Sequence, residues 1–110
     1  MADRSVARGW LPLQLVLAVE PAAELLGVSA VARGDGFVRV YERAGKPRNV
    51  PEAWKRKRFG FVSRHMAQAL ARAEPFWVNG HPTRRHLALV MWAYSPTPGR
   101  LRAWAKTVTA

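Results

Sequence analysis

Residues 51–74 carry the pattern that most limits how this chain can fold. Apolar side chains recur there at steps of three and four residues, at Phe59, Val62, Met66, Ala69, Leu70 and Ala73. That spacing is typical of an amphipathic helix that buries one face. Pro51 and Glu52 suit its first turn, where proline is tolerated and a carboxylate is favourable. The sequence therefore predicts a long helix from Pro51 to about Glu74.

The segment 33–45 predicts a second, shorter helix. Its Gly-Asp-Gly start is also compatible with a hairpin, but its apolar and charged residues separate onto opposite sides only when it is wound as a helix. Asp35 is expected to cap the start of this helix and Gly45 to follow its end. Further helices are expected at 21–27, beginning at Pro21, at 83–94, and at 100–108, where Leu101, Trp104 and Val108 face inward.

Residues 11–19, LPLQLVLAV, predict either a buried helix or a short buried strand, because they are apolar on every side. Proline, asparagine and glycine mark loops at 46–51 and 74–82. A chain of 110 residues is long enough for one compact domain. We therefore predict a loose arm over 1–9 and one mainly α domain over 10–110, a bundle of four to five helices.

Composition excludes several classes of protein. The chain has no cysteine, which rules out disulfides, thiolate metal sites and thiol catalysis. No apolar run approaches the roughly 20 residues that a membrane span needs. Arg4 and Arg8 before WLPLQLVLAV resemble the start of a signal peptide, but Pro12 and Gln14 interrupt the apolar run. We therefore expect a cytoplasmic protein, associated with the nucleoid or with ribonucleoprotein if it is bacterial.

The charge of the chain is strongly polarised. Lysine and arginine number 18 against 7 acids, which gives a net charge of +11. Residues 1–45 hold five bases and five acids, whereas residues 46–110 hold thirteen bases and two acids. The domain thus divides into a neutral part, 10–45, and a strongly basic part, 46–110. Such a basic surface predicts a polyanionic partner.

The first candidate site surrounds the sequence AWKRKRFGF. Four consecutive cations lie between Trp54 and Phe61, and two more follow along the same predicted helix: Lys55, Arg56, Lys57, Arg58, Arg64 and Arg72. Cations bind phosphates, and the aromatic faces of Trp54 and Phe61 are candidates for stacking on bases. In the alternative interpretation, both aromatics pack under another helix and the cations form a solvated rim.

The second candidate site is the predicted helix start at Thr83, Arg84 and Arg85. Cations are unfavourable there because a helix N-terminus already carries partial positive charge, so a bound phosphate would relieve the repulsion. Alternatively, an arginine pairs with Glu74 or Glu52. Two further cations either extend the positive surface or lie on a solvated helix back: Arg102 and Lys106.

Two other interpretations receive little support from the residues. PAAELLGVS, 21–29, resembles the first helix and turn of helix-turn-helix DNA-binding domains, but AVARGDG follows with two glycines where a reading helix is needed. Catalysis would require His65 to meet His81 or His86, since the acids are scattered singly and no nucleotide-binding motif occurs. We therefore predict no catalytic residue, no metal and no cofactor.

The leading hypothesis is a small basic protein that binds DNA or RNA through phosphate contacts, with weak sequence specificity. Neutralising Arg56, Lys57 and Arg64 together is then expected to weaken binding to all sequences and to flatten its salt dependence. The alternative is a protein-interaction module that docks its basic face on an acidic partner, since tryptophan and arginine are common interface hot spots. A membrane surface is not expected, because the basic helices lack a wide apolar outer face.

Overall fold

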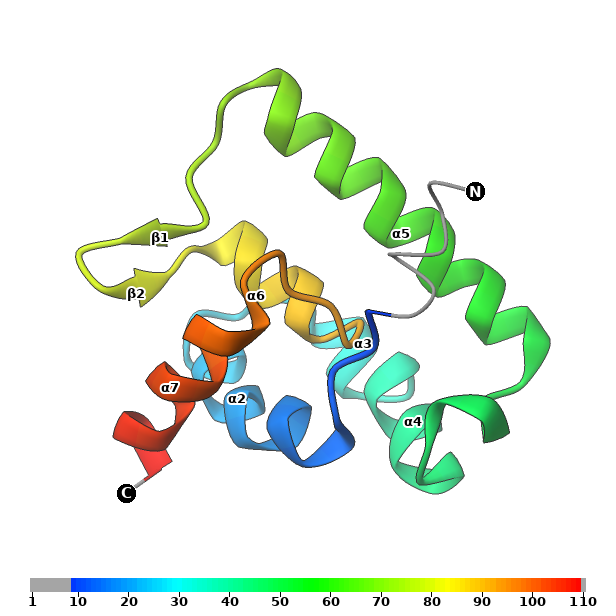
Figure 1. The fold of residues 1–110 in the computed structure, drawn as a ribbon. Helices are drawn as coiled ribbons and strands as arrows, with labels where there is room; N and C mark the ends of the chain where they lie inside the picture. The colour runs from blue at the N-terminus through cyan, green and yellow to red at the C-terminus, as the bar shows by residue number, and fades with distance from the viewer. Residues whose placement is uncertain (1–8, 110) are drawn as a thin grey trace.

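The computed structural model describes residues 9–109, so most of the predicted arm over 1–9 lies outside the described residues. The chain forms a mainly helical single domain with five helices of seven residues or more, a one-turn helix and a short hairpin (Figure 1). The elements in chain order are α2 (Leu13–Leu25), α3 (Ala30–Arg33), α4 (Phe37–Ala44), the 3₁₀ helix η1 (Pro47–Asn49), α5 (Glu52–Ala71), β1 (Trp77–Val78), β2 (His81–Pro82), α6 (Arg84–Val90) and α7 (Pro98–Thr109).

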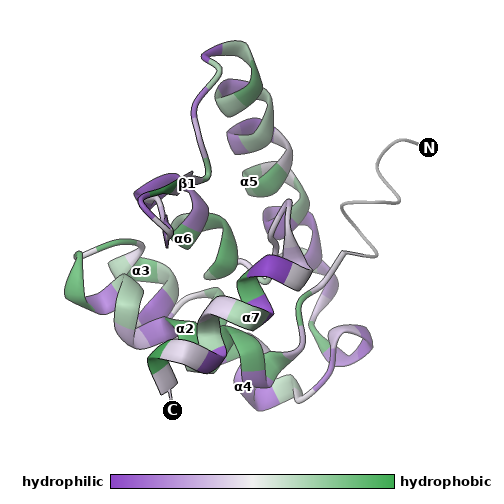
Figure 2. Ribbon diagram, turned by 60° about the vertical axis from the view of Figure 1, so that its left-hand side comes forward, coloured by the Kyte–Doolittle hydropathy of each residue, from purple (hydrophilic) through white to green (hydrophobic). Residues whose placement is uncertain are grey.

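Helix α2 lies at the centre of the core and packs against α4, α6 and α7. Its buried side chains include Val16 and Val19, which lie in one cluster with Phe37 and Tyr41 of α4. The Tyr41 hydroxyl donates a hydrogen bond of 2.7 Å to the carbonyl oxygen of Leu11, which ties α4 to the start of α2. Figure 2 shows hydrophobic residues of α2, α4 and α6 within the body, whereas α5 carries hydrophilic and hydrophobic residues along its length.

Most of the sequence 11–19, from Leu13 onward, forms helix and not strand, and α2 continues through the position where a new helix was predicted to begin. Pro21 lies inside α2. Proline removes one helical hydrogen bond, but Val19 before it and Ala23 after it are both buried. Packing on both sides of Pro21 therefore keeps one continuous helix.

The helix predicted within 33–45 is confirmed as α4 (Phe37–Ala44), with a different start. Gly36, not Asp35, is its N-cap residue. A Cβ atom at Gly36 would lie 2.5 Å from the Val31 carbonyl oxygen, so only glycine fits where α3 and α4 approach. Gly45 follows α4 with a φ of 82°, as expected for a glycine that ends a helix. Because α3 has only four residues, no reading helix follows α2.

The predicted loop at 74–82 contains the two-stranded antiparallel hairpin, which the sequence did not predict. Trp77 pairs with Pro82 and Val78 with His81. Asn79 and Gly80 between them both have positive φ, 52° and 76°, which is the conformation that a two-residue hairpin turn requires. The sequence Asn-Gly is typical of a hairpin turn, but each strand is too short to show an alternating pattern of apolar and polar residues.

Helix α5 is confirmed, but its buried face differs from the predicted stripe. Val62 and Ala69 are buried as expected, whereas Leu70 is 71% exposed and Arg58 is buried in place of Phe59. The helix contacts α4 and α6, and several of its other residues are exposed, among them Arg56, Lys57 and Arg64. On α7, Leu101 is buried as predicted, Trp104 is half-buried and Val108 is 50% exposed.

Candidate nucleic-acid interface

Helix α5 presents a continuous face that points away from the body. Its three buried residues, Arg58, Val62 and Ala69, are four and seven residues apart and lie along one line of the helix. Each residue turns the helix by about 100°, so the line on the opposite side of α5 from these buried residues can be found from the sequence. That line contains only small residues, and cations lie on both sides of it. We call these residues the outward face of α5: Ala53, Arg56, Lys57, Gly60, Arg64, Ala67 and Ala71.

The cations of this outward face are exposed. Among residues 9–109, Arg56, Lys57 and Arg64 form no ion pair with a carboxylate. The Lys57 ammonium lies 4.4 Å from the centre of the Trp54 ring. Lys55 differs, because its ammonium lies 3.5 Å from the Glu52 carboxylate. Three cations are thus available to an external anion.

Arg58 is a correction to the first predicted site. Its side chain is 1% exposed. Its Nε and Nη2 donate hydrogen bonds of 2.8 and 2.9 Å to the carbonyl oxygens of Trp92 and Ala93, and its guanidinium lies 4.2 Å from the Trp10 ring centre. Burial lowers the pKa of Arg58 to about 10, so it stays charged at neutral pH. Since these carbonyls follow the C-terminus of α6, where positive charge is favourable, Arg58 holds the fold and does not belong to a surface site.

The two aromatics predicted as base-stacking platforms pack within the protein. Phe61 lies between His65 and Trp92, with ring centres 4.0 and 4.9 Å apart and near-parallel planes. Trp92 in turn stacks on Phe37 at 5.0 Å. Trp54 is half-buried beside Trp92, and Lys57 covers its ring. The alternative interpretation, that these aromatics belong to the packing of the domain, is therefore the one that the geometry supports.

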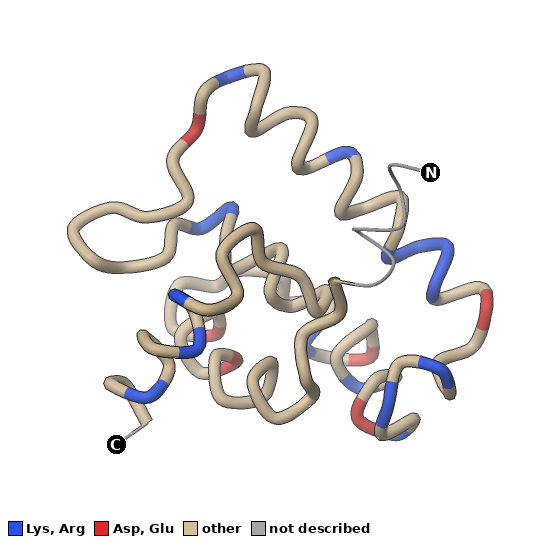
Figure 3. The backbone as a smooth tube through the Cα atoms, in the orientation of Figure 1, with Lys and Arg blue, Asp and Glu red and all other residues tan. Residues whose placement is uncertain are grey.

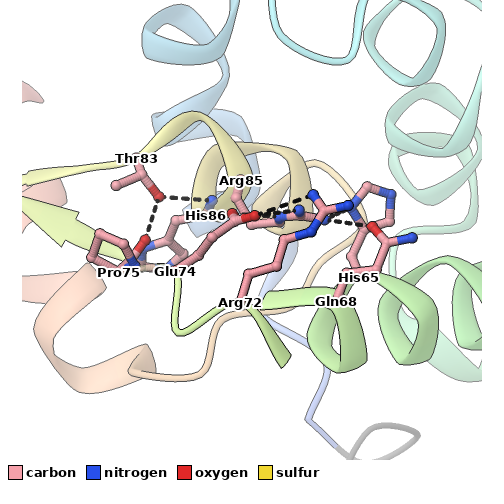
Figure 4. Close-up of polar contacts among 8 residues, drawn as sticks. All are labelled: His65, Gln68, Arg72, Glu74, Pro75, Thr83, Arg85 and His86. Atoms are coloured by element: carbon pink, nitrogen blue, oxygen red, sulfur yellow. Dashed lines mark hydrogen bonds and ion pairs between the residues drawn. The ribbon is translucent and has the colours of Figure 1, made fainter. Parts of the chain in front are cut away.

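The second predicted site is occupied by contacts inside the protein (Figure 4). Thr83 caps α6: its hydroxyl accepts from the His86 backbone N–H and donates to the Pro75 carbonyl. Arg85 donates two hydrogen bonds, of 2.9 and 2.7 Å, to the Glu74 carboxylate. Its Nη1 donates to Gln68 Oε1 at 3.0 Å and to His65 Nδ1 at 2.9 Å. Arg84 donates to the Leu26 carbonyl oxygen at 2.6 Å.

The charged groups of this network shift one another's pKa. The Arg85 hydrogen bond lowers the pKa of Glu74, and the same bond raises the pKa of Arg85. A guanidinium has no acceptor, so His65 Nδ1 accepts from it and the imidazole is neutral. Burial, together with the charge of Arg85, lowers the pKa of His65 in agreement with this state. The pairing of an arginine with Glu74, the alternative to a phosphate cradle, is what the structure contains.

The two predicted sites meet across a shallow groove of about 600 Å³ between α5, α6 and the turn that joins α2 to α3. Its walls include Ser29, Phe61, His65, Gln68, Arg84 and Arg85. Arg84 is the exposed cation of the groove, since Glu74 neutralises Arg85. The sequence did not predict that α5 and α6 contact each other here. The one feature of the sequence that pointed to this contact is Glu74, which is one of only two acids after residue 45.

The remaining predicted cations do not join the outward face of α5. Arg72 is 66% exposed and lies 3.6 Å from Glu74 at the C-terminal end of α5. Arg102 and Lys106 are exposed on α7, which lies apart from α5 in Figure 1 and Figure 3. Sequence reasoning missed Lys46 and Arg48, which are exposed just before α5. The feature of the sequence that could have identified them is the change in charge balance that begins at Lys46.

A buried serine–histidine pair lies beside this region. His86 Nε2 and Ser95 Oγ are 2.7 Å apart, and His86 Nδ1 is 2.9 Å from the Phe76 carbonyl oxygen. Burial lowers the pKa of His86. The distance suits a nucleophile and its base, but the two residues are 0% and 5% exposed, which is typical of a structural contact. The pair stabilises the junction of the hairpin, α6 and the loop before α7.

The described part of the chain offers no metal site and no membrane span. Within residues 9–109, no three histidine, aspartate or glutamate side chains are grouped to hold a metal ion. No helix in this range is both long and apolar enough to cross a membrane. Comparison of the chain with models of protein families, with curated proteins and with solved structures finds no match. The function is therefore inferred from the geometry of the molecule itself.

Proposed function

We propose that this protein binds nucleic acid through phosphate contacts made by the outward face of α5. One observation carries the proposal: Arg56, Lys57 and Arg64 are exposed on a single helix face and have no carboxylate partner within residues 9–109. Such cations release counterions when they meet phosphates, which drives binding. Phosphates are the same for every base, so the proposed binding has weak sequence specificity.

Cations just before the start of this face support the same proposal. Lys46 and Arg48 precede α5, and both are exposed. A helix of 20 residues is about 30 Å long, so these charges extend over the length of several nucleotides. A path of this kind suits a polyanion better than a small anion.

An acidic protein docked on the same face is the competing function. Protein interfaces obtain most of their affinity from buried aromatic and arginine anchors. The aromatics next to the outward face, Trp54 and Phe61, are engaged inside the domain, and Arg58 is buried. The outward face itself carries cations and small residues and no aromatic anchor, and that surface favours nucleic acid.

A salt titration tests the proposal. Fluorescence anisotropy would measure binding to single-stranded DNA, duplex DNA and structured RNA of equal length. We expect the logarithm of the affinity to fall linearly with the logarithm of the salt concentration, with a slope of about −3 for a DNA duplex and about −2 for a single strand if three phosphate contacts form. Absence of binding to all three at low salt, with stoichiometric recovery of one acidic protein from a lysate, would show that the face serves a protein.

A further inference from the structure

We infer that the nucleic acid is duplex DNA in the B form, with the outward face of α5 seated in the major groove. This inference rests on the proposed function and names its substrate class. It follows from three properties of the surface: the size of the projecting helix, the placement of its cations, and the covered faces of the neighbouring aromatics.

The first property is the shape of α5. The helix has 20 residues, three of which are buried, and among residues 9–109 it packs mainly against α4 and α6 (Figure 1). The major groove of B-DNA is about 12 Å wide and admits an α-helix. The groove winds around the duplex, so a straight helix of about 30 Å enters it over part of its length. The free side of α5 thus fits this groove in width.

The second property is the distribution of charge across the face. Arg56 lies on one side of the central line, and Lys57 and Arg64 lie on the other. Arg64 is seven residues beyond Lys57, which is about 10 Å along the axis. A groove has a phosphate backbone on each wall, so cations on both sides of a helix match it.

The residues along the central line between these cations are small. Ala53, Gly60, Ala67 and Ala71 have small or no side chains, and all but the half-buried Gly60 are exposed. A Cβ atom added at Gly60 would meet nothing within 4 Å, so the fold itself does not require glycine there. The charges carry the assignment, and the small residues bring the helix close to the floor of the groove.

The third property argues against single strands and RNA helices. Proteins that hold single strands stack bases on open aromatic faces. Phe61 has one ring on each face, and Trp54 is half-buried beside Trp92. The major groove of A-form RNA is too deep and narrow for protein side chains to enter. Duplex DNA remains the form that a bare cationic helix fits.

Two matched substitutions test the placement of α5. Ala67→Leu adds an exposed side chain on the central line of the outward face, and Ala103→Leu adds the same side chain at an exposed position of α7. The probes are a 24-base-pair duplex of mixed sequence, one of its strands, and the corresponding RNA duplex, at one salt concentration. We expect the DNA duplex to bind at least tenfold more tightly than the other two. Ala67→Leu should weaken duplex binding about tenfold, and Ala103→Leu less than twofold.

The outcomes separate this inference from the proposed function. Equal or tighter binding to the single strand or to the RNA duplex overturns the inference and leaves phosphate binding in place. An Ala67→Leu variant that is folded by circular dichroism and binds the DNA duplex like the unmodified protein also overturns it, because α5 would then lie outside the groove. Failure of all three probes to bind contradicts the proposed function itself.

Discussion

The outward face of α5 and the junction of α5 with α6 hold cations that look alike in the sequence but have different surroundings. At the junction, Arg85 is 13% exposed and bonded to Glu74, Gln68 and His65. On the outward face, Arg56 and Arg64 are exposed, and no carboxylate of residues 9–109 pairs with them. The difference teaches that nearby acceptors, not the density of basic residues, decide which cations can meet a ligand.

The same contrast occurs between neighbours in one run. Lys57 is exposed, whereas Arg58 is buried against the carbonyl oxygens that follow α6. One residue turns the helix by about 100°, which is enough to move a side chain from solvent into the core. A basic run on a helix therefore contains residues with opposite roles.

The largest expected effect comes from the buried arginine. Arg58→Met should lower the free energy of unfolding by about 3 kcal/mol, because the carbonyls of Trp92 and Ala93 lose charged hydrogen bonds in a buried place. Arg56→Met, its exposed control, should change that free energy by less than about 0.5 kcal/mol. Urea denaturation measures both. Equal stability of the two variants would contradict the structural role of Arg58.

Arg85 should have the next largest effect. Arg85→Met removes the hydrogen bonds to Glu74, Gln68 and His65, and we expect a loss of about 1 kcal/mol, since the network is partly exposed to solvent. Nucleic-acid affinity at fixed salt should stay within about threefold, because other cations make the proposed contacts. A large loss of affinity with unchanged stability would place Arg85 in the binding surface after all.

Phe61 tests whether the aromatic stack is internal. Phe61→Leu keeps an apolar side chain but loses the stacking on His65 and Trp92, so stability should fall by about 1 kcal/mol. Binding to single-stranded DNA should not change. If Phe61→Leu lowers single-strand affinity about tenfold while thermal unfolding is unaffected, its ring contacts bases and the stack opens on binding.

Acid pH should have the smallest effect. Arg85 lowers the pKa of Glu74 in the folded protein, so the unfolded chain, with a carboxyl pKa of about 4.3, takes up the proton first as the pH falls. The contact between Arg85 and Glu74 therefore stabilises the folded protein at pH values above the carboxyl pKa of the unfolded chain. This stabilisation is lost as the pH falls through the lower pKa that Glu74 has in the folded protein. Glu74→Gln should therefore show a smaller fall in melting temperature between pH 5 and pH 3. Glu52→Gln, at the exposed start of α5, is the control, and an equal change in both variants would contradict the assignment.

Local pattern predicted much of the fold. The apolar spacing of 37–44 and 51–74 predicted α4 and α5, and Gly45 was correctly placed after α4. The continuous helix through Pro21 was missed, because its stability comes from packing on both sides of the proline. The hairpin was missed because its strands have two residues each. Both errors concern features that tertiary contacts and turn geometry determine.

The candidate site was predicted less completely than the fold. Arg56, Lys57 and Arg64 lie off the predicted apolar stripe and are exposed, because residues off such a stripe usually face solvent. The burial of Arg58 could not be read from its neighbours, since its acceptors lie 34 and 35 residues further along the chain. The capture of Arg85 by Glu74 likewise depends on how α5 and α6 meet.

A comparison of salt slopes in two matched double variants tests the central claim most directly. Lys57→Gln with Arg64→Gln removes two cations from the outward face of α5, and Arg102→Gln with Lys106→Gln removes two exposed cations from α7. Both variants have the same net charge, and the probe is whichever nucleic acid the unmodified protein binds most tightly. We predict that the first variant loses about two units of slope and the second less than about half a unit. Equal losses in the two variants would contradict the account, because binding would then follow total charge and not the face of α5.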